Sequence, residues 1–408
     1  MSRVLLLLTH QFPHDSGDAA FVRNEIAALA QEFDEVRIVS FWGEGVPALP
    51  LPPNCRYLGS VGRVTAARAF RGLISGRRLR TLWAVAARAR RVGALKSADL
   101  RAMLVGMSVA QRLQQLGARH TPFESLTVYS FWGVDIAYSL PWFVRKQDAV
   151  ATRVHRYDLD EESEGYRPLR PAVLGVTEVL LTISDAAQSY ARERYSSYIS
   201  PQRILVRRLG VPGPDAPPAD ASAPERVLVV SASSVIPLKR VDLILDALAE
   251  VARRGHAVAW THFGDGPGLA AVRSRAAELV EELPLLDVAF PGRVPVQTIL
   301  DHYAHAATTL FMNLSTIEGV PVSIMEAAAY GVPAVATDVG ATREIVGSAF
   351  GSGVLVARDA TVSEIADAVV DVVEHLDRFD ARANWAERFD ANENARAAAA
   401  AVADLNRG

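Results

Sequence analysis

The sequence predicts an α/β protein made of two doubly wound domains in tandem. The chain has 408 residues, half of them hydrophobic, and this length exceeds what one compact core usually holds. A strand–helix–strand pattern occupies residues 1–42, and a similar pattern begins again at Arg226, after a segment rich in proline and alanine. Alternating strands and helices are typical of parallel sheets with helices on both faces.

The expected first domain spans residues 1–212. It opens with a buried strand, RVLLLLTH, which is followed by the helix FVRNEIAALAQEF and the strand EVRIVSFW. In that helix Ile26, Leu29 and Phe33 share one face, as the core-facing side of a helix requires. Three later apolar runs predict further strands of the same sheet: SLTVYSFWG, DAVATRVHRYD and VTEVLLTIS. Residues 213–225 lack apolar periodicity and predict a linker.

The expected second domain spans residues 226–385. It opens with the strand RVLVVSASS, the amphipathic helix VDLILDALAEVARRG and the strand AVAWTHFGDGP, which runs into a glycine loop. Four further runs continue the series: LDVAFPGRV, TTLFMNLS, VPAVATDVG and GSGVLVA. Residues 386–408 predict a C-terminal helix that can pack back on the first domain. Ligands of such folds bind at the carboxyl ends of the strands, so we expect the two domains to face each other across a cleft.

The composition argues against several classes of protein. The apolar run Val4–Leu8 stops at Thr9 and is too short for a membrane span or a signal peptide, so we expect a cytoplasmic protein. Cys55 is the only cysteine, which excludes an internal disulfide, a cysteine-based zinc site and an iron–sulfur cluster. The run GDGPG lacks both the dinucleotide and the P-loop spacing, so neither NAD nor ATP chemistry is indicated.

Charge is distributed unevenly along the chain. From Gly45 to Ala98 there is no Asp or Glu, whereas arginines are frequent. Within this segment Leu82 and Trp83 fall on one helical face and Arg80 on another, so residues 63–96 predict either a helix at an anionic membrane surface or an ordinary solvated helix. Nucleic-acid binding is a third alternative, but no helix-turn-helix, RNA-binding or zinc-finger pattern supports it.

The stretch TIEGVPVSIMEAAAYGVPAVATD carries two glutamates in an otherwise uncharged context. Pro321 suits the first turn of a helix, so the spacing predicts a helix over 321–330, with Glu318 just outside its start and Glu326 inside it. The first N–H groups of a helix have no partner within the helix and lie at the positive end of its dipole, where they can bind a phosphate.

The spacing of these glutamates suggests a long ligand. Eight residues of continuous helix span ~12 Å, which is comparable to a sugar diphosphate. We therefore expect ribose hydroxyls at Glu326, the transferred sugar at Glu318 and the diphosphate at the helix start. The alternative is that Glu318 only caps the helix and Glu326 points into solvent.

The residues around these two glutamates resemble the motif of a known protein family. The run EGVPVSIMEAAAYGVPAVATDVGATREIV resembles the signature of family-four retaining glycosyltransferases of the GT-B fold, E-G-F-G-x-x-x-x-E-A-M-A-x-G-x-P-V-V-A-x-D-x-G-G-x-x-E-I-V. Three shorter runs, SFWGVDIA, HRYDL and RRLGV, resemble bacterial members that build capsule, exopolysaccharide or lipid-linked oligosaccharide. The resemblance implies transfer of a sugar from a nucleoside diphosphate donor to a glycan or lipid-linked acceptor.

The resemblance also implies roles for individual residues. Glu318, His155 and Lys239 take catalytic positions, and Gly17 and Asp18 lie in the acceptor loop. The donor-binding positions are Glu326, Gly319, Val320, Pro321, Val322, Ser323, Ser234, Gly264 and Arg293. Ser234 stands where the family has an arginine on the donor diphosphate, so one positive charge of that clamp is missing.

The implied reaction retains configuration by front-face displacement and needs no metal or other cofactor. The triplet Asp158-Leu159-Asp160 has the D-x-D form of a metal motif, but it opens an acidic run that we interpret as the first turn of a solvated helix. Two alternatives remain open: a hydrolase or epimerase of nucleotide-sugars with the same fold, and a noncatalytic nucleotide-sugar-binding subunit.

Overall fold

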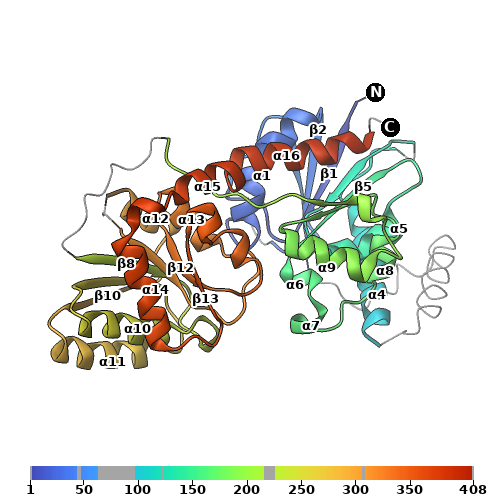
Figure 1. The fold of residues 1–408 in the computed structure, drawn as a ribbon. Coiled ribbons are helices and arrows are strands. Elements are labelled where there is room, and N and C mark those ends of the chain that lie inside the picture. The colour runs from blue at the N-terminus through green and yellow to red at the C-terminus, as the bar shows by residue number, and fades with distance from the viewer. Residues whose placement is uncertain are drawn as a thin grey trace. The chain divides into compact units, whose positions relative to one another are not determined.

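A computed structural model describes residues 2–43, 47–62, 97–121, 123–215, 226–305 and 308–406 (Figure 1). The chain forms two compact units, which we treat separately. Unit 1 consists of Met1–Leu209 with Asn392–Gly408, and unit 2 of Gly210–Ala391. The basic segment 63–96 and residues 216–225 of the expected linker lie outside the described residues. The membrane-binding helix therefore stays a prediction.

Unit 1 contains a seven-stranded sheet in the order β3-β2-β1-β4-β5-β6-β7, in which every neighbouring pair is parallel. All six residues of β1 are buried, as expected for a central strand covered on both faces. The strands are β1 (Val4–Thr9), β2 (Glu35–Ser40), β3 (Cys55–Ser60), β4 (Thr127–Ser130), β5 (Ala149–Val154), β6 (Val179–Thr182) and β7 (Ile204–Val206).

The helices of unit 1 bury the alternating side chains of this sheet. Val4, Leu6 and Leu8 of β1 belong to a core that includes residues of α4, α5 and α8, whereas α1 buries Val22 and Leu29. The helices are α1 (Ala19–Glu32), α4 (Ser97–Gln115), α5 (Leu140–Phe143), α6 (Arg156–Leu159), α7 (Glu161–Glu164), α8 (Arg170–Leu174), α9 (Asp185–Tyr195) and α16 (Ala391–Ala403). The α16 residues from Asn392 onward belong to unit 1, where the Ala397 carbonyl accepts from Arg207 Nε at 2.9 Å.

Unit 2 contains a six-stranded parallel sheet in the order β10-β9-β8-β11-β12-β13. The chain starts at β8, adds strands on one side and then crosses to β11 on the other side. This reversal places a topological switch point between β8 and β11, where ligands of doubly wound folds bind. The strands are β8 (Val227–Ala232), β9 (Val258–Phe263), β10 (Leu286–Gly292), β11 (Leu310–Asn313), β12 (Ala334–Thr337) and β13 (Gly353–Val356).

Helices cover both faces of the unit 2 sheet. One hydrophobic core joins the strands to α10, α11 and α14, and a second joins them to α12, α13 and α15 (Figure 1). The bounds are α10 (Val241–Arg253), α11 (Leu269–Glu282), α12 (Val296–His305), α13 (Val322–Ala329), α14 (Val362–Glu374) and α15 (Ala381–Arg388). No helix in the described ranges has both the length and the hydropathy needed to cross a bilayer.

The α/β prediction with two parallel sheets is confirmed, but two strands escaped the sequence analysis. The residues of β3 are mostly half-buried, so this edge strand shows no apolar run, and β7 has only three residues. The helix that was expected over 321–330 is slightly shorter, because Pro321 is extended and serves as the N-cap of α13.

Candidate functional site

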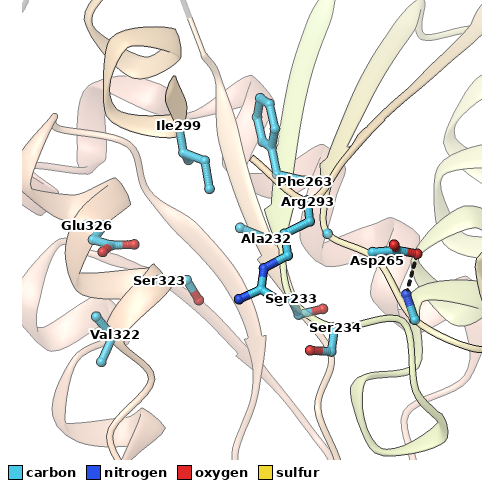
Figure 2. A pocket seen from close by; sticks show the side chains of 12 residues that line it. Ala232, Ser233, Ser234, Phe263, Asp265, Arg293, Ile299, Val322, Ser323 and Glu326 are labelled. Carbon is cyan, nitrogen blue, oxygen red and sulfur yellow. Dashed lines mark hydrogen bonds between the residues drawn. The ribbon is translucent and has the colours of Figure 1, made fainter. Parts of the chain in front are cut away.

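A pocket of about 780 Å³ lies at the carboxyl edge of the unit 2 sheet (Figure 2). Its walls come from the ends of β8 and β9, the turn after β10, and α12 and α13. The lining residues are Ala232, Ser233, Ser234, Phe263, Gly264, Asp265, Gly266, Arg293, Ile299, Val322, Ser323 and Glu326. The pocket therefore lies at the edge where the sheet topology places the switch point.

The start of α13 forms one wall of this pocket. Val322 and Ser323 are the first two helical residues, so their N–H groups have no partner inside the helix. Glu326 follows one turn later, and Figure 2 shows its side chain on the pocket side of α13, above Ser323. Unpaired N–H donors and one carboxylate thus lie along a single face of the helix.

The loops after β8 and β9 form the opposite wall, and they approach each other very closely. Gly264 has φ +152°, and a Cβ atom there would lie 1.8 Å from the Ser233 carbonyl oxygen. The Ser233 N–H donates to the Phe263 carbonyl at 3.0 Å, and the Gly264 N–H donates to the Gly292 carbonyl at 2.9 Å. Only glycine fits at position 264 without moving these loops.

A hydrogen-bond relay lies directly beneath this wall. Trp260 Nε1 donates to Ser231 Oγ at 2.9 Å, and Ser231 Oγ lies 2.8 Å from His262 Nδ1. The indole N–H can only donate, so Ser231 Oγ accepts from Trp260, and the same oxygen is hydrogen-bonded to His262 Nδ1. Burial lowers the pKa of His262 to about 4, which keeps the ring neutral.

The basic side chain at this pocket is that of Arg293, one of the expected donor-binding positions. Ser234 lines the pocket with a hydroxyl. The neighbouring basic residue Arg240 turns elsewhere, since its Nε donates to the Leu314 carbonyl at 2.5 Å and its Nη1 to the Arg358 carbonyl at 2.7 Å. Among the described residues that line the pocket, Arg293 alone is basic.

Glu318 and Lys239 form an ion pair outside the lining of this pocket. Lys239 Nζ lies 2.5 Å from Glu318 Oε1, which also accepts from Asn313 Nδ2 at 3.2 Å. Both side chains are largely covered, with 26% and 12% of their surfaces exposed. The residues between Glu318 and the helix, Gly319, Val320 and Pro321, do not line the pocket either.

In unit 1, the loop that contains Gly17 and Asp18 follows β1. Gly17 has φ +57°, and Asp18 is only 2% exposed. The Asp18 carboxylate accepts from the N–H groups of His10, Gln11 and Phe12 at 2.6, 2.8 and 2.9 Å, and from Trp132 Nε1 at 3.0 Å. Asp18 thus holds the loop in shape from within, and its carboxylate is not a surface group.

His155 follows β5 and lies in an aromatic cluster at the carboxyl edge of the unit 1 sheet. Its ring centroid is 4.2 Å from that of Trp132, which stacks on His10 at 4.6 Å with an interplanar angle of 1°. Burial lowers the pKa of His155 well below its ordinary value, and the charges of Arg153 and His10 add to this effect. His155 is therefore neutral near pH 7.

The partners of His155 were not predicted from the sequence. His10 directly follows β1, and Trp132 comes two residues after the end of β4, which is a neighbour of β1 in the sheet. His10 Nε2 also lies 3.5 Å from an Asp135 carboxylate oxygen. The position of these residues in the sequence could have predicted the cluster, because residues that follow parallel strands gather at one edge of the sheet.

The interpretation of Asp158 as part of a solvated helix turn was wrong. Asp158 is fully buried, and its carboxylate accepts from the N–H of Gly133 at 2.5 Å and from the N–H of His155. Burial raises the pKa of Asp158 to about 6. Its role is to fix the start of α6 beside His155. Within the described ranges, no three or more His, Cys, Asp or Glu side chains are grouped as metal ligands would be.

The sequence is similar to a known protein family and to known proteins. Residues 224–375 match the family described as "Glycosyl transferases group 1". A relative from Mycobacterium tuberculosis, the GDP-mannose-dependent alpha-(1-6)-phosphatidylinositol monomannoside mannosyltransferase, is 29% identical over 303 residues, which cover 68% of this chain and 73% of the relative. The candidate colanic acid biosynthesis glycosyltransferase WcaL of Salmonella typhimurium is 27% identical over 196 residues, or 46% of this chain and 47% of WcaL.

The fold has solved counterparts as well. The lipopolysaccharide outer core galactosyltransferase WaaB, in its apo form, superposes with a TM-score of 0.67. The alignment covers 99% of this chain and all of WaaB at 15% sequence identity. At this level of sequence identity, the structural similarity shows a shared fold only.

Proposed function

We propose that the chain, whose residues 224–375 match the group 1 family and whose fold is GT-B, is a glycosyltransferase of that family. In this proposal it transfers a sugar with retention of configuration from a nucleoside diphosphate donor to an acceptor hydroxyl. We propose a glycan or lipid-linked acceptor in cell-surface polysaccharide or glycolipid synthesis, since the mycobacterial relative is named for a phosphatidylinositol mannoside. The observation that supports the donor most strongly is the pocket at the start of α13, which combines unpaired N–H groups with Glu326.

In this proposal the donor lies along the wall formed by α13. Glu326 accepts hydrogen bonds from the ribose hydroxyls, and the N–H groups of Val322 and Ser323 meet the diphosphate. We propose that Glu318 and Lys239, whose Oε1 and Nζ atoms are 2.5 Å apart, contact the donor where sugar and phosphate join. A carboxylate for the sugar hydroxyls and an ammonium for the leaving phosphate are both needed at that junction.

The proposed reaction exchanges one bond at the anomeric carbon. The bond from this carbon to the β-phosphate oxygen breaks, and a bond to the acceptor oxygen forms on the same face. The acceptor proton passes to the departing phosphate oxygen, so the products are the glycoside and a nucleoside diphosphate. Lys239 and the N–H groups of α13 stabilise the charge that develops on the leaving group.

Unit 1 is proposed to take part in binding the acceptor. Asp18 fixes the loop that contains Gly17 by accepting hydrogen bonds from its backbone. We propose that the loop backbone contacts the acceptor, because the Asp18 carboxylate is already hydrogen-bonded within the loop. His155 is neutral and can donate or accept a hydrogen bond without adding charge to its surroundings. Neither a metal nor an organic cofactor has a part in this proposal.

The test of the proposal separates donor binding from turnover. GDP-mannose, UDP-glucose and ADP-glucose are titrated by calorimetry, and transfer of radiolabelled sugar to lipid and glycan fractions is then measured with the donor that binds. Free sugar or an epimer in the absence of acceptor would indicate a hydrolase or epimerase. Donor binding without turnover on any fraction would indicate a noncatalytic subunit.

Two variants probe the two glutamates with the same donor. Glu326→Ala should weaken donor binding roughly ten- to hundredfold, because it removes an acceptor for two hydroxyls. Glu318→Gln should lower kcat by about 100-fold while the donor Kd stays within about threefold, since it acts where the bond breaks. Glu278→Ala, which changes an exposed glutamate of α11, is the control. Unchanged kinetics in both variants would refute these assignments.

A further inference from the structure

The main chain at Glu318 is held in place by the loop that follows β12. Gly340 in this loop has φ +56°, and a Cβ atom there would lie 2.0 Å from the Glu318 carbonyl oxygen. The Ala341 N–H donates to the Gly319 carbonyl at 3.0 Å. These contacts fix the backbone, but the direction of the Glu318 carboxylate depends on its side-chain partners.

The Glu318 carboxylate has two side-chain partners, and both reach the same oxygen atom. Lys239 Nζ lies 2.5 Å from Oε1, and Asn313 Nδ2 donates to Oε1 at 3.2 Å. Among the residues that the structure describes, no hydrogen bond reaches Oε2. The two protein donors therefore occupy one oxygen of Glu318 and leave the other oxygen for a hydroxyl group of a ligand.

Asn313 is the last residue of β11, and its amide group is fixed on both sides. Its Oδ1 accepts from the Ser315 N–H at 3.0 Å and from Ser315 Oγ at 2.6 Å. A backbone N–H can only donate, so the oxygen of the amide faces Ser315 and the nitrogen faces Glu318. Ser315 is buried, and its carbonyl accepts from Thr337 Oγ1 at 2.5 Å. The amide is thus connected through Ser315 to the end of the neighbouring strand β12.

The two donors to Glu318 differ in how a bound donor substrate would affect them. In the proposed reaction the Lys239 ammonium stabilises the leaving phosphate, so its charge is shared between that phosphate and Glu318. A lysine side chain also has a flexible stem. The Asn313 amide is neutral and is fixed by Ser315, so its hydrogen bond to Glu318 does not compete with the phosphate.

We propose that Asn313 is a positioning residue of the transfer reaction, which holds the Glu318 carboxylate toward the transferred sugar while Lys239 serves the phosphate. This inference rests on the proposed function. The competing role of Asn313 is structural, because an Asn oxygen that accepts from the N–H two residues later forms an Asx turn and shapes the loop after β11. The two roles use opposite ends of the amide, so variants can separate them.

The experiment measures kcat of the full chain, with the donor that the wild type binds and the acceptor fraction that it glycosylates, and the donor Kd by calorimetry. Asn313→Ala should lower kcat roughly tenfold and leave the donor Kd within about threefold, because the lost hydrogen bond orients a group at the reacting carbon. Ser315→Ala removes one of the two bonds that fix the amide and should lower kcat less than Asn313→Ala does.

The pH dependence of Asn313→Asp separates the two roles. The new carboxylate still accepts from Ser315, so the turn is kept, but it has no donor for Glu318 when ionised. At pH 8 the two carboxylates repel each other, and kcat should be roughly hundredfold below that of the wild type at the same pH. Near pH 5.5 the pair can share one proton, which restores a hydrogen bond, and the deficit should shrink to about tenfold. A structural role predicts no such change with pH.

The charged neighbours of position 313 and a matched control complete the design. In the described part of the chain, the charged side chains that bond to residues 313–318 are Lys239, at Glu318, and Arg240, at the Leu314 carbonyl. Both are cations, so neither adds a second acid to the pair. Asn54→Asp makes the same chemical change just before β3, where Asn54 Nδ2 donates to two backbone carbonyls at 2.8 Å. This control should lower the free energy of unfolding and leave kcat unchanged.

The possible failures can be told apart. A wild type that transfers no sugar from any of the donors would overturn the proposed function and this inference together. If the wild type transfers sugar and Asn313→Ala keeps its kcat, the inference alone is overturned. The same holds if the deficit of Asn313→Asp is equal at pH 8 and pH 5.5, since the variant then acts through the shape of the loop.

Discussion

His262 and His155 follow a common rule: each is an imidazole buried near the carboxyl edge of its own sheet and held neutral. His262 Nδ1 is hydrogen-bonded to Ser231 Oγ, and His155 packs against Trp132. Burial lowers the pKa of both rings, because a charged imidazole loses its hydration there. Neutral rings add no positive charge to their surroundings.

The depressed pKa of His262 predicts a loss of stability in weak acid. The unfolded chain takes up the proton near pH 6.5, whereas the folded ring resists it until about pH 4. Stability is therefore complete above pH 6.5 and falls as the pH drops toward 4, by about 3 kcal/mol for this group alone. Urea unfolding between pH 7 and pH 4 measures the slope.

The control for this prediction is His262→Asn. The Asn side-chain amide can replace the hydrogen bond of Nδ1 to Ser231 but does not titrate. Its stability should depend less on pH over the same range. Equal slopes for wild type and variant would show that His262 takes no part in the acid sensitivity.

The direction and burial of single side chains are the features that the sequence predicts least well. The motif identified Glu326, Val322 and Ser323, and the structure brings all three to one pocket. The direction of a side chain such as Arg240 depends on the carbonyls that surround it, and no local pattern encodes these. The burial of Asp158 likewise depends on Gly133, which is distant in sequence.

At the scale of elements, the site is assembled from strand ends and one short helix. The parallel strands of unit 2 stop at the same edge, and residues that follow β8, β9 and β10 line the pocket together with residues of α12 and α13. The β8 and β9 loops are joined through backbone hydrogen bonds of Ser233 and Gly264. The shape of this wall therefore depends on backbone geometry more than on side-chain chemistry.

Gly264→Ala tests this dependence. The new methyl group would lie 1.8 Å from the Ser233 carbonyl oxygen, so the loops must separate. We expect a loss of at least about 2 kcal/mol in the free energy of unfolding, together with weaker donor binding. Thermal unfolding and calorimetry with the donor measure the two effects.

A matched control for this variant is Gly255→Ala. Gly255 also has a positive φ, +96°, but a Cβ atom there meets nothing within 4 Å. The control should show backbone strain of about 1 kcal/mol and normal donor affinity. If Gly264→Ala binds donor as well as the control does, the close approach of the two loops is not needed for the site.

Elements were more predictable than residues, for a physical reason. Central strands are buried on both faces and appear as apolar runs, so β1, β8 and β11 were evident. Edge strands such as β3 face solvent and lack that signal. The start of α13 was missed by one residue, because proline fits both the first helical turn and the position before it.

At the scale of the whole molecule, the two units repeat one arrangement. Each sheet places its first strand in the middle, adds strands on one side and then continues on the other. The restart of the strand–helix–strand pattern at Arg226 predicted this repetition without any motif. The sequence also indicated that a C-terminal helix over residues 386–408 can pack back on the first domain. Asn392–Gly408 group with unit 1, where Arg207 Nε donates to the Ala397 carbonyl.

The central claim is that unit 2 binds the nucleoside diphosphate along the start of α13. Hydrogen exchange of the full chain, with and without saturating GDP or UDP, tests this claim most directly, because the N–H groups of Val322 and Ser323 have no helical partner and should exchange rapidly when free. We predict that the nucleotide slows exchange at these two residues and in the loops at 233–234 and 264–266. Slower exchange confined to unit 1, with the start of α13 unchanged, would contradict the account.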